Sequence, residues 1–149
     1  MALLEKQLVV KKSLLPGAGK GLFTKILIPK GTRIVEYKGR ITTWKEISAD
    51  ENENLYIYYV KRHHVIDAFP VKTALARYAN DAKGLKKVKG LTNNAAYVED
   101  GLKVYIESTK DIPAGAEIFV SYGKEYWEVI RYNLRLEKKR KANKTKKKA

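Results

Sequence analysis

Tyrosines are unusually numerous in this sequence, and their side chains suit a chemical role. The 149 residues include ten tyrosines, no cysteine and only two histidines, His63 and His64. The absence of cysteine excludes disulfides and cysteine-bound zinc. Two adjacent histidines on a strand would point to opposite faces, so we expect no metal site. A tyrosine ring can hold an aliphatic stem on its face while its hydroxyl orients a nitrogen atom.

Four short segments narrow the function further. They are residues 19–23 (Gly-Lys-Gly-Leu-Phe), 36–39 (Glu-Tyr-Lys-Gly), 77–82 (Arg-Tyr-Ala-Asn-Asp-Ala) and 116–123 (Ala-Glu-Ile-Phe-Val-Ser-Tyr-Gly). A lone Gly-x-Gly recurs in many proteins. All four segments in this order and spacing, together with Ile-Asp-Ala at 66–68, resemble the signature segments of the SET domain. The resemblance covers roughly residues 6–127.

This resemblance implies a small, zinc-free protein-lysine methyltransferase that uses S-adenosylmethionine. Such a reaction needs a neutral amine, whereas a lysine with a pKa of about 10.4 is almost wholly protonated at neutral pH. Burial in an aromatic channel beside a positive sulfonium lowers that pKa. A sequence rich in tyrosine suits such a channel.

The resemblance also assigns catalytic roles to three tyrosines. Tyr122 matches the tyrosine that closes the fourth segment, and its hydroxyl is expected at the transferring methyl. Tyr37 matches the tyrosine of the second segment. Tyr97 resembles a position that helps to set the number of methyl groups added, which favours monomethylation, although Val120 occupies the other such position. Tyr37 and Tyr97 have an alternative role as core aromatics, and we interpret Tyr56, Tyr58, Tyr59 and Tyr105 as ordinary strand residues.

The cofactor residues follow from the same resemblance. We expect S-adenosylmethionine to contact Gly19, Lys20, Gly21, Arg77, Tyr78, Asn80, Asp81, Tyr122 and Trp127. The glycines allow close backbone approach to the methionine end, although a plain turn would use them too. Trp127 resembles an aromatic residue near the adenine, and it would also serve as a helix anchor.

The sequence departs from the family pattern at two points. Family members usually have histidine where this chain has Asp81, and a carboxylate cannot donate a hydrogen bond as an imidazole does. Many relatives also close the lysine channel with a zinc-bound cysteine cluster after the domain. Here a helix from about residue 124, or a second subunit in a homodimer, must close it.

The elements that position these residues are predicted to be short strands. We expect strands near 8–11, 22–24, 33–37, 55–60, 65–67, 102–106 and 117–122, with a hairpin turn at 99–101. Thr42 or Thr43 is expected to cap a short helix, with Glu46 as its partner. The predicted fold is the mainly β SET fold of several small sheets, with a pseudoknot that brings Asn80 and Tyr122 together and a C-terminal helix.

Charge and hydropathy indicate the partners. The formal net charge is +15, of which residues 137–149, with eight Lys or Arg and one Glu, carry +7. We predict one domain over residues 1–136 and a basic, disordered tail over 137–149 that binds nucleic acid largely independently of sequence. The sequence shows no stretch long enough to span a membrane and no secretory signal, so we expect an intracellular protein, nucleoid-associated in a bacterium or nuclear in a eukaryote.

Two functions therefore remain open. The first is methylation of lysines in histones or histone-like, nucleic-acid-associated proteins, the tail lysines included. The second is a degenerate SET domain that acts as a nucleic-acid or chromatin binding module, which Asp81 and the basic tail favour.

Overall fold

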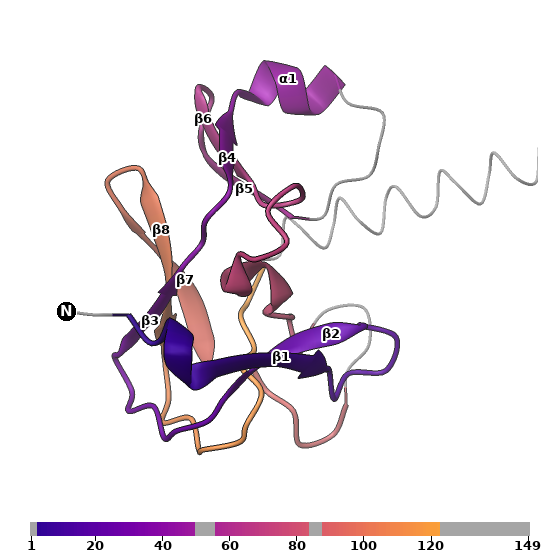
Figure 1. Cartoon of the computed structure of the whole chain (residues 1–149), viewed down its shortest axis with the longest axis vertical. Helices are drawn as coiled ribbons and strands as arrows, with labels where there is room; N and C mark the ends of the chain where they lie inside the picture. The colour runs from indigo at the N-terminus through magenta and orange to yellow at the C-terminus, as the bar shows by residue number, and fades with distance from the viewer. Residues whose placement is uncertain (1–2, 50–55, 84–87, 123–149) are drawn as a thin grey trace, which may run out of the picture.

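The protein is a mainly β structure made of three small antiparallel sheets (Figure 1). The computed structural model describes residues 3–49, 56–83 and 88–122. The elements in chain order are η1 (Glu5–Gln7), β1 (Leu8–Lys12), β2 (Lys20–Thr24), β3 (Arg33–Glu36), β4 (Arg40–Thr42), α1 (Trp44–Ala49), β5 (Ile57–Lys61), β6 (His64–Asp67), η2 (Leu75–Tyr78), β7 (Ala95–Asp100) and β8 (Lys103–Ser108). This confirms the predicted fold class. The helix predicted from residue 124, Trp127 and the basic tail lie outside the described residues.

The first sheet is a two-stranded hairpin of β1 and β2, in register from Leu8 opposite Thr24 to Lys12 opposite Lys20. The turn between the strands is closed by the Ser13 amide, which donates to the Gly19 carbonyl at 2.8 Å. Gly19 has φ +72°, a left-handed conformation that favours glycine. The glycine pair noted in the sequence therefore shapes the end of this hairpin.

The second sheet has β8 at its centre, between β3 and β7. Along β8, Val104, Ile106 and Ser108 are buried and their neighbours are not, as alternation on a one-sided sheet requires. The predicted hairpin turn is displaced, because the strands pair as far as Asp100 opposite Lys103. The turn is therefore Gly101-Leu102, with Gly101 at φ +62°.

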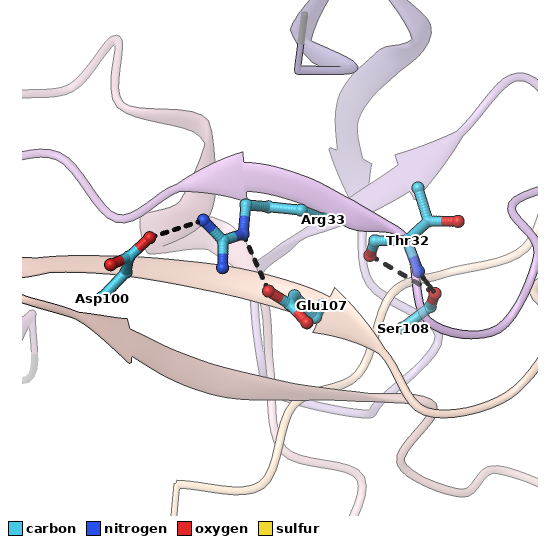
Figure 2. Close-up of polar contacts among 5 residues, drawn as sticks. All are labelled: Thr32, Arg33, Asp100, Glu107 and Ser108. Carbon is cyan, nitrogen blue, oxygen red and sulfur yellow. Dashed lines mark hydrogen bonds and ion pairs between the residues drawn. The ribbon is translucent and has the colours of Figure 1, made fainter. Parts of the chain in front are cut away.

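An arginine clamp ties the three strands of this sheet together on its outer face (Figure 2). Arg33 Nε donates to Glu107 at 2.8 Å, and its terminal nitrogen donates to Asp100 at 3.0 Å. The guanidinium also lies over the ring of Tyr105, 4.2 Å from its centroid. The hydrogen bonds to Glu107 and Asp100 raise the pKa of Arg33 above its ordinary value. Exposed pairs of this kind contribute little individually, but this network spans β3, β8 and the end of β7.

The third sheet consists of β4, β6 and β5, with α1 beside it at the top of Figure 1. Tyr58 pairs with Ile66 and Tyr59 with Val65, so the two tyrosines point to opposite faces. The α1 cap was correctly predicted: the Glu46 amide donates to Thr43 Oγ1 at 3.3 Å. In the described part of the chain the Glu46 carboxylate does not close a capping box with the Thr43 amide; it accepts a hydrogen bond from the Thr42 hydroxyl at 2.6 Å.

The two histidines differ from the prediction, because they are not both strand residues. His63 lies in the turn between β5 and β6, and His64 begins β6. Within the described ranges, no group of three or more metal-binding side chains comes together.

The segment 117–122 crosses between two other parts of the chain rather than forming the regular strand expected there. Phe119 bridges Asn80 on one side, and Val120 bridges Ala95, the first residue of β7, on the other. The Val120 amide donates to the Asn80 carbonyl at 2.8 Å. Asn94 clamps the crossing from its other side, because its side chain accepts from the Phe119 amide at 2.9 Å and donates to the Glu117 carbonyl at 3.0 Å. The Asn80 and Tyr122 segments therefore meet, as the predicted pseudoknot requires.

The main hydrophobic core draws on all three sheets and on the crossing segment. Its fully buried side chains include Leu22, Ile28, Ile34, Val104, Ile106, Ile112, Ile118 and Val120. No helix in the described part of the chain is long and apolar enough to cross a membrane.

Candidate active site

Four tyrosine rings form one cluster beside the crossing segment. The Tyr97 ring stacks on Tyr122, with centroids 6.3 Å apart and planes 19° apart. It also meets Tyr37 edge-on at 5.8 Å and Tyr58 at 5.2 Å. Tyr37 and Tyr58 are themselves 6.0 Å apart. The three tyrosines predicted from sequence therefore lie together, and Tyr58 joins them.

Each ring comes from a different element. Tyr37 directly follows β3 and is buried; its amide donates to the Val104 carbonyl at 2.7 Å. Tyr97 lies in β7 opposite Ile106, on the core side of that sheet. Tyr58 projects from β5 in the third sheet. The cluster therefore fills the junction between two sheets and the crossing segment.

Tyr58 is the member that the sequence interpretation missed. Burial, reinforced by the nearby Glu99 carboxylate and a hydrogen bond to it, raises the pKa of Tyr58 to about 12. Its hydroxyl therefore remains a donor at neutral pH. Glu99 lies two residues after Tyr97 on β7, so both face the same side of the sheet.

Tyr122 is held from both of its ends. Its hydroxyl donates a hydrogen bond to the Ala79 carbonyl. Its main-chain amide donates to Asp81 Oδ2 at 2.9 Å. Ala79 and Asp81 flank Asn80, so one short stretch fixes both the backbone and the hydroxyl of the tyrosine.

Asp81 acts here as an acceptor of hydrogen bonds. Its carboxylate is buried, and Oδ1 accepts from the Lys83 amide at 2.8 Å and from Asn93 Nδ2 at 3.0 Å. With the Tyr122 amide, these are three donors to one carboxylate. The residue that replaces the family histidine is thus suited to the position it occupies, since each of these partners needs an acceptor.

The predicted cofactor residues Gly19, Lys20, Gly21 and Asn80 form a second group next to this one. Asn80 Nδ2 donates to the Lys20 carbonyl at 3.0 Å, which joins the hairpin to the stretch after η2 that pairs with the crossing segment. At Gly21 there is no room for a side chain, because an added Cβ would lie 2.2 Å from a Glu117 oxygen. At Gly19 an added Cβ would meet none of the described residues within 4 Å, so the backbone there is open with respect to them.

This donor and acceptor set fits the methionine end of S-adenosylmethionine, an ammonium and a carboxylate. Asn80 Oδ1 has no hydrogen-bond partner among the described residues and offers an acceptor to an ammonium. Lys20 is exposed and offers a cation to a carboxylate. The open backbone at Gly19 lets a ligand approach closely.

Arg77 and Tyr78 are occupied by contacts within the protein. The Arg77 guanidinium donates to the Ala68 and Phe69 carbonyls at 3.1 and 2.9 Å and lies over the Tyr56 ring at 4.1 Å. The Tyr78 hydroxyl donates to the Lys72 carbonyl at 2.8 Å. Both residues therefore brace η2, the element immediately before Asn80, and their contact with a cofactor stays a prediction. Trp127 lies outside the described residues.

Comparisons with known proteins identify the family of the chain. A family model of the SET domain matches residues 19–123. The histone-lysine N-methyltransferase EZH2 of Chaetomium thermophilum is 28% identical over 133 residues, covering 81% of this chain and 8% of that much longer protein. The methyltransferase domain of human PR domain-containing protein 2 shares the fold, with a TM-score of 0.58 at 23% identity over 78% of this chain and 77% of that one. The chain therefore belongs to the SET-domain family.

Proposed function

We propose that this protein transfers a methyl group from S-adenosylmethionine to the ε-amine of a protein lysine. The observation that carries the proposal is the meeting of two groups at Tyr122. Its ring stacks on Tyr97 of the aromatic cluster, and its backbone and hydroxyl are bonded to the residues on either side of Asn80. This arrangement supports a lysine channel lined by the aromatic rings, next to a position for the amino-acid end of the cofactor.

The residues of this chain would divide the work as follows. Asn80, Lys20 and the backbone at Gly19 hold the methionine end of the cofactor, which supplies an electrophilic methyl on a cationic sulfur. Rings of Tyr37, Tyr58 and Tyr97 surround the aliphatic stem of the lysine and exclude water, which lowers the pKa of its amine toward the neutral form. The Tyr122 hydroxyl, held by the Ala79 carbonyl, orients the nitrogen.

We favour monomethylation and a basic, nucleic-acid-associated substrate, such as a histone or histone-like protein. Tyr97 is enclosed by three other rings, which leaves little room for a methylated amine beside it. A basic substrate would be repelled by a chain of net charge +15, and binding of both to one polyanion offsets that repulsion. The lysines of the chain's own tail are further candidate targets.

Labelled methyl transfer to a panel of basic proteins tests the proposal, with Tyr122→Phe as the diagnostic variant. We expect at least a 100-fold loss of transfer, on the order of what a positioned catalytic hydroxyl contributes, with cofactor affinity by calorimetry changed by less than about threefold. Tyr105→Phe is the matched control, because Tyr105 lies on the outer face of its sheet beneath Arg33. Full activity in Tyr122→Phe would refute the role of this residue.

Absence of S-adenosylmethionine binding by the wild-type chain would instead favour the second candidate, a SET domain that only binds nucleic acid. The net charge supports that candidate. The contacts of the buried Asp81 carboxylate support the enzyme, because one of them holds the main chain of Tyr122.

A further inference from the structure

Glu117 is a buried acidic residue to which the proposed mechanism gives no part. It is 2% exposed, and it bridges Phe23 of β2 at the start of the crossing segment. It lies directly against Gly21, since an added Cβ there would meet its carboxylate. The close packing shows why residue 21 must be glycine: a side chain would displace the carboxylate.

The contacts of Glu117 reach both the hairpin turn and Asn80. One oxygen accepts from the Leu14 amide at 2.8 Å, and the other accepts from the Ser13 hydroxyl at 2.7 Å. The second oxygen also lies 3.5 Å from Asn80 Nδ2, the nitrogen that donates to the Lys20 carbonyl. The carboxylate thus binds the start of the turn directly, at Ser13 and Leu14. It reaches the end of the turn through Asn80, which donates to the Lys20 carbonyl.

The acceptor character of Glu117 also sets the orientation of the Asn80 amide. An asparagine side chain has a donor end and an acceptor end of nearly the same shape, and its surroundings decide which way it points. Here the near side of the amide faces two acceptors, the Glu117 carboxylate and the Lys20 carbonyl, so the NH₂ group must lie there. The amide oxygen consequently lies on the opposite side of the amide group, where it has no hydrogen-bond partner among the described residues.

We propose that Glu117 is a positioning residue, which presents the Gly19–Gly21 backbone and the Asn80 amide oxygen to the ammonium of the cofactor. This inference rests on the proposed function, since it concerns the same cofactor pocket. Glutamine at this position would keep the size of the side chain but add an NH₂ group. That group would face the Asn80 donor or the Leu14 donor, so the Asn80 amide would lose its single preferred orientation.

The test compares Glu117→Gln with Glu107→Gln in the full chain. Glu107 is a matched control, because its carboxylate pairs with Arg33 on the outer face of the second sheet. The probe is S-adenosylhomocysteine, titrated by calorimetry at a temperature where each variant is folded by circular dichroism. We expect about a tenfold loss of affinity in Glu117→Gln and less than a twofold change in Glu107→Gln.

A second measurement needs no ligand. Amide hydrogen exchange of the ligand-free protein should be faster at Leu14 and Gly19–Gly21 in Glu117→Gln than in the wild type, and unchanged there in Glu107→Gln. Ser13→Ala, which removes one of the three donors, should lower affinity by about threefold, and it carries the test if Glu117→Gln does not fold.

The outcomes separate the possible failures. If the wild-type chain does not bind the probe, the proposed function fails, whatever the exchange result shows. If the wild type binds, and the folded variants bind equally tightly despite a lower melting temperature, Glu117 has a purely structural role and this inference is overturned.

Discussion

At the scale of single residues, Tyr97 is the centre of the candidate channel. It contacts the rings of Tyr37, Tyr58 and Tyr122. A shift in the position of any of these rings would therefore also shift Tyr97. Tyr58 adds a polar link to this aromatic group, because its hydroxyl is bonded to Glu99. The candidate channel would therefore have a hydroxyl at the Tyr122 end and a hydroxyl–carboxylate pair at the Tyr58 end.

The raised pKa of Tyr58 predicts how the stability of the protein depends on pH. A tyrosine whose pKa is raised in the folded state, here to about 12 from 10.0, stabilises the fold at pH values below 10. This contribution is lost as the pH rises from 10 through 12, because the folded protein resists forming the phenolate. We expect Tyr58→Phe to show a shallower loss of stability over that interval than the wild type.

Urea denaturation at several pH values between 9 and 12 measures this difference. Absorbance titration at the phenolate band checks the assignment. The wild type should contain one more tyrosine that ionises only at high pH than the variant does. Tyr59→Phe is the control, because Tyr59 is exposed and points to the opposite face of the third sheet. Parallel stability curves for wild type and Tyr58→Phe would contradict the prediction.

The family resemblance singled out Tyr37, Tyr97 and Tyr122 from the sequence, but it did not single out Tyr58. Residues 56–59 are all β-prone, and three of the four are tyrosines. Which of them faces the site depends on the register of β5 on β6, since a shift of one residue exchanges the two faces. The structure resolves this by pairing Tyr58 with Ile66.

At the scale of elements, the crossing segment is what assembles the site. Asp81 and Asn94 hold it by hydrogen bonds: Asp81 accepts from the Tyr122 amide, and Asn94 accepts from the Phe119 amide. The sequence predicts that the two motifs meet only through the family resemblance, since no local pattern encodes such a crossing. The role of Asp81 as a buried hydrogen-bond acceptor could not be predicted from the sequence either. The donors to its carboxylate lie two, twelve and forty-one residues away in the chain.

Removal of the Asp81 carboxylate should therefore lower the stability of the fold and the rate of methyl transfer, with a smaller effect on cofactor affinity. In Asp81→Ala the Tyr122 amide and Asn93 Nδ2 lose their buried acceptor, which should cost on the order of 3 kcal/mol of unfolding free energy. We expect methyl transfer to fall more than affinity for S-adenosylhomocysteine, because Tyr122 loses its backbone anchor while Asn80 keeps its bond to Lys20.

Urea denaturation and calorimetry on the same samples provide both quantities. Asp111→Ala is the control, because the Asp111 carboxylate also accepts a main-chain amide, that of Lys30, but at an exposed position. That control should change stability by less than about 1 kcal/mol. Equal losses of stability in the two variants would show that Asp81 is not the anchor of the crossing.

At the scale of the whole molecule, positive charge dominates. The formal charge of +15 falls to +7 when residues 138–149, which hold eight Lys or Arg and no acid, are removed (15 − 8 = 7). The folded residues contain local ion pairs, such as the Arg33 clamp, whereas residues 138–149 contain no acidic residue. If nucleic acid is the shared scaffold of enzyme and substrate, this stretch should provide most of the contacts to phosphate.

Truncation after Glu137 should weaken binding to double-stranded DNA and flatten its dependence on salt. Each cation that neutralises a phosphate contributes about 0.9 to the slope of log affinity against log salt concentration, so loss of several such contacts is readily measured.

The control keeps all 149 residues and replaces the eight basic side chains of this stretch by glutamine, so its length is unchanged. The replaced residues are the lysines at 138, 139, 141, 144 and 146–148 and the arginine at 140. Fluorescence anisotropy between 50 and 200 mM salt should give the same shallow slope for both variants. In both variants, methyl transfer to a short lysine peptide should stay unchanged. Methyl transfer to a DNA-bound basic protein should fall. An unchanged slope would place the phosphate contacts on the folded domain instead and remove the tail from the proposed mechanism of substrate capture.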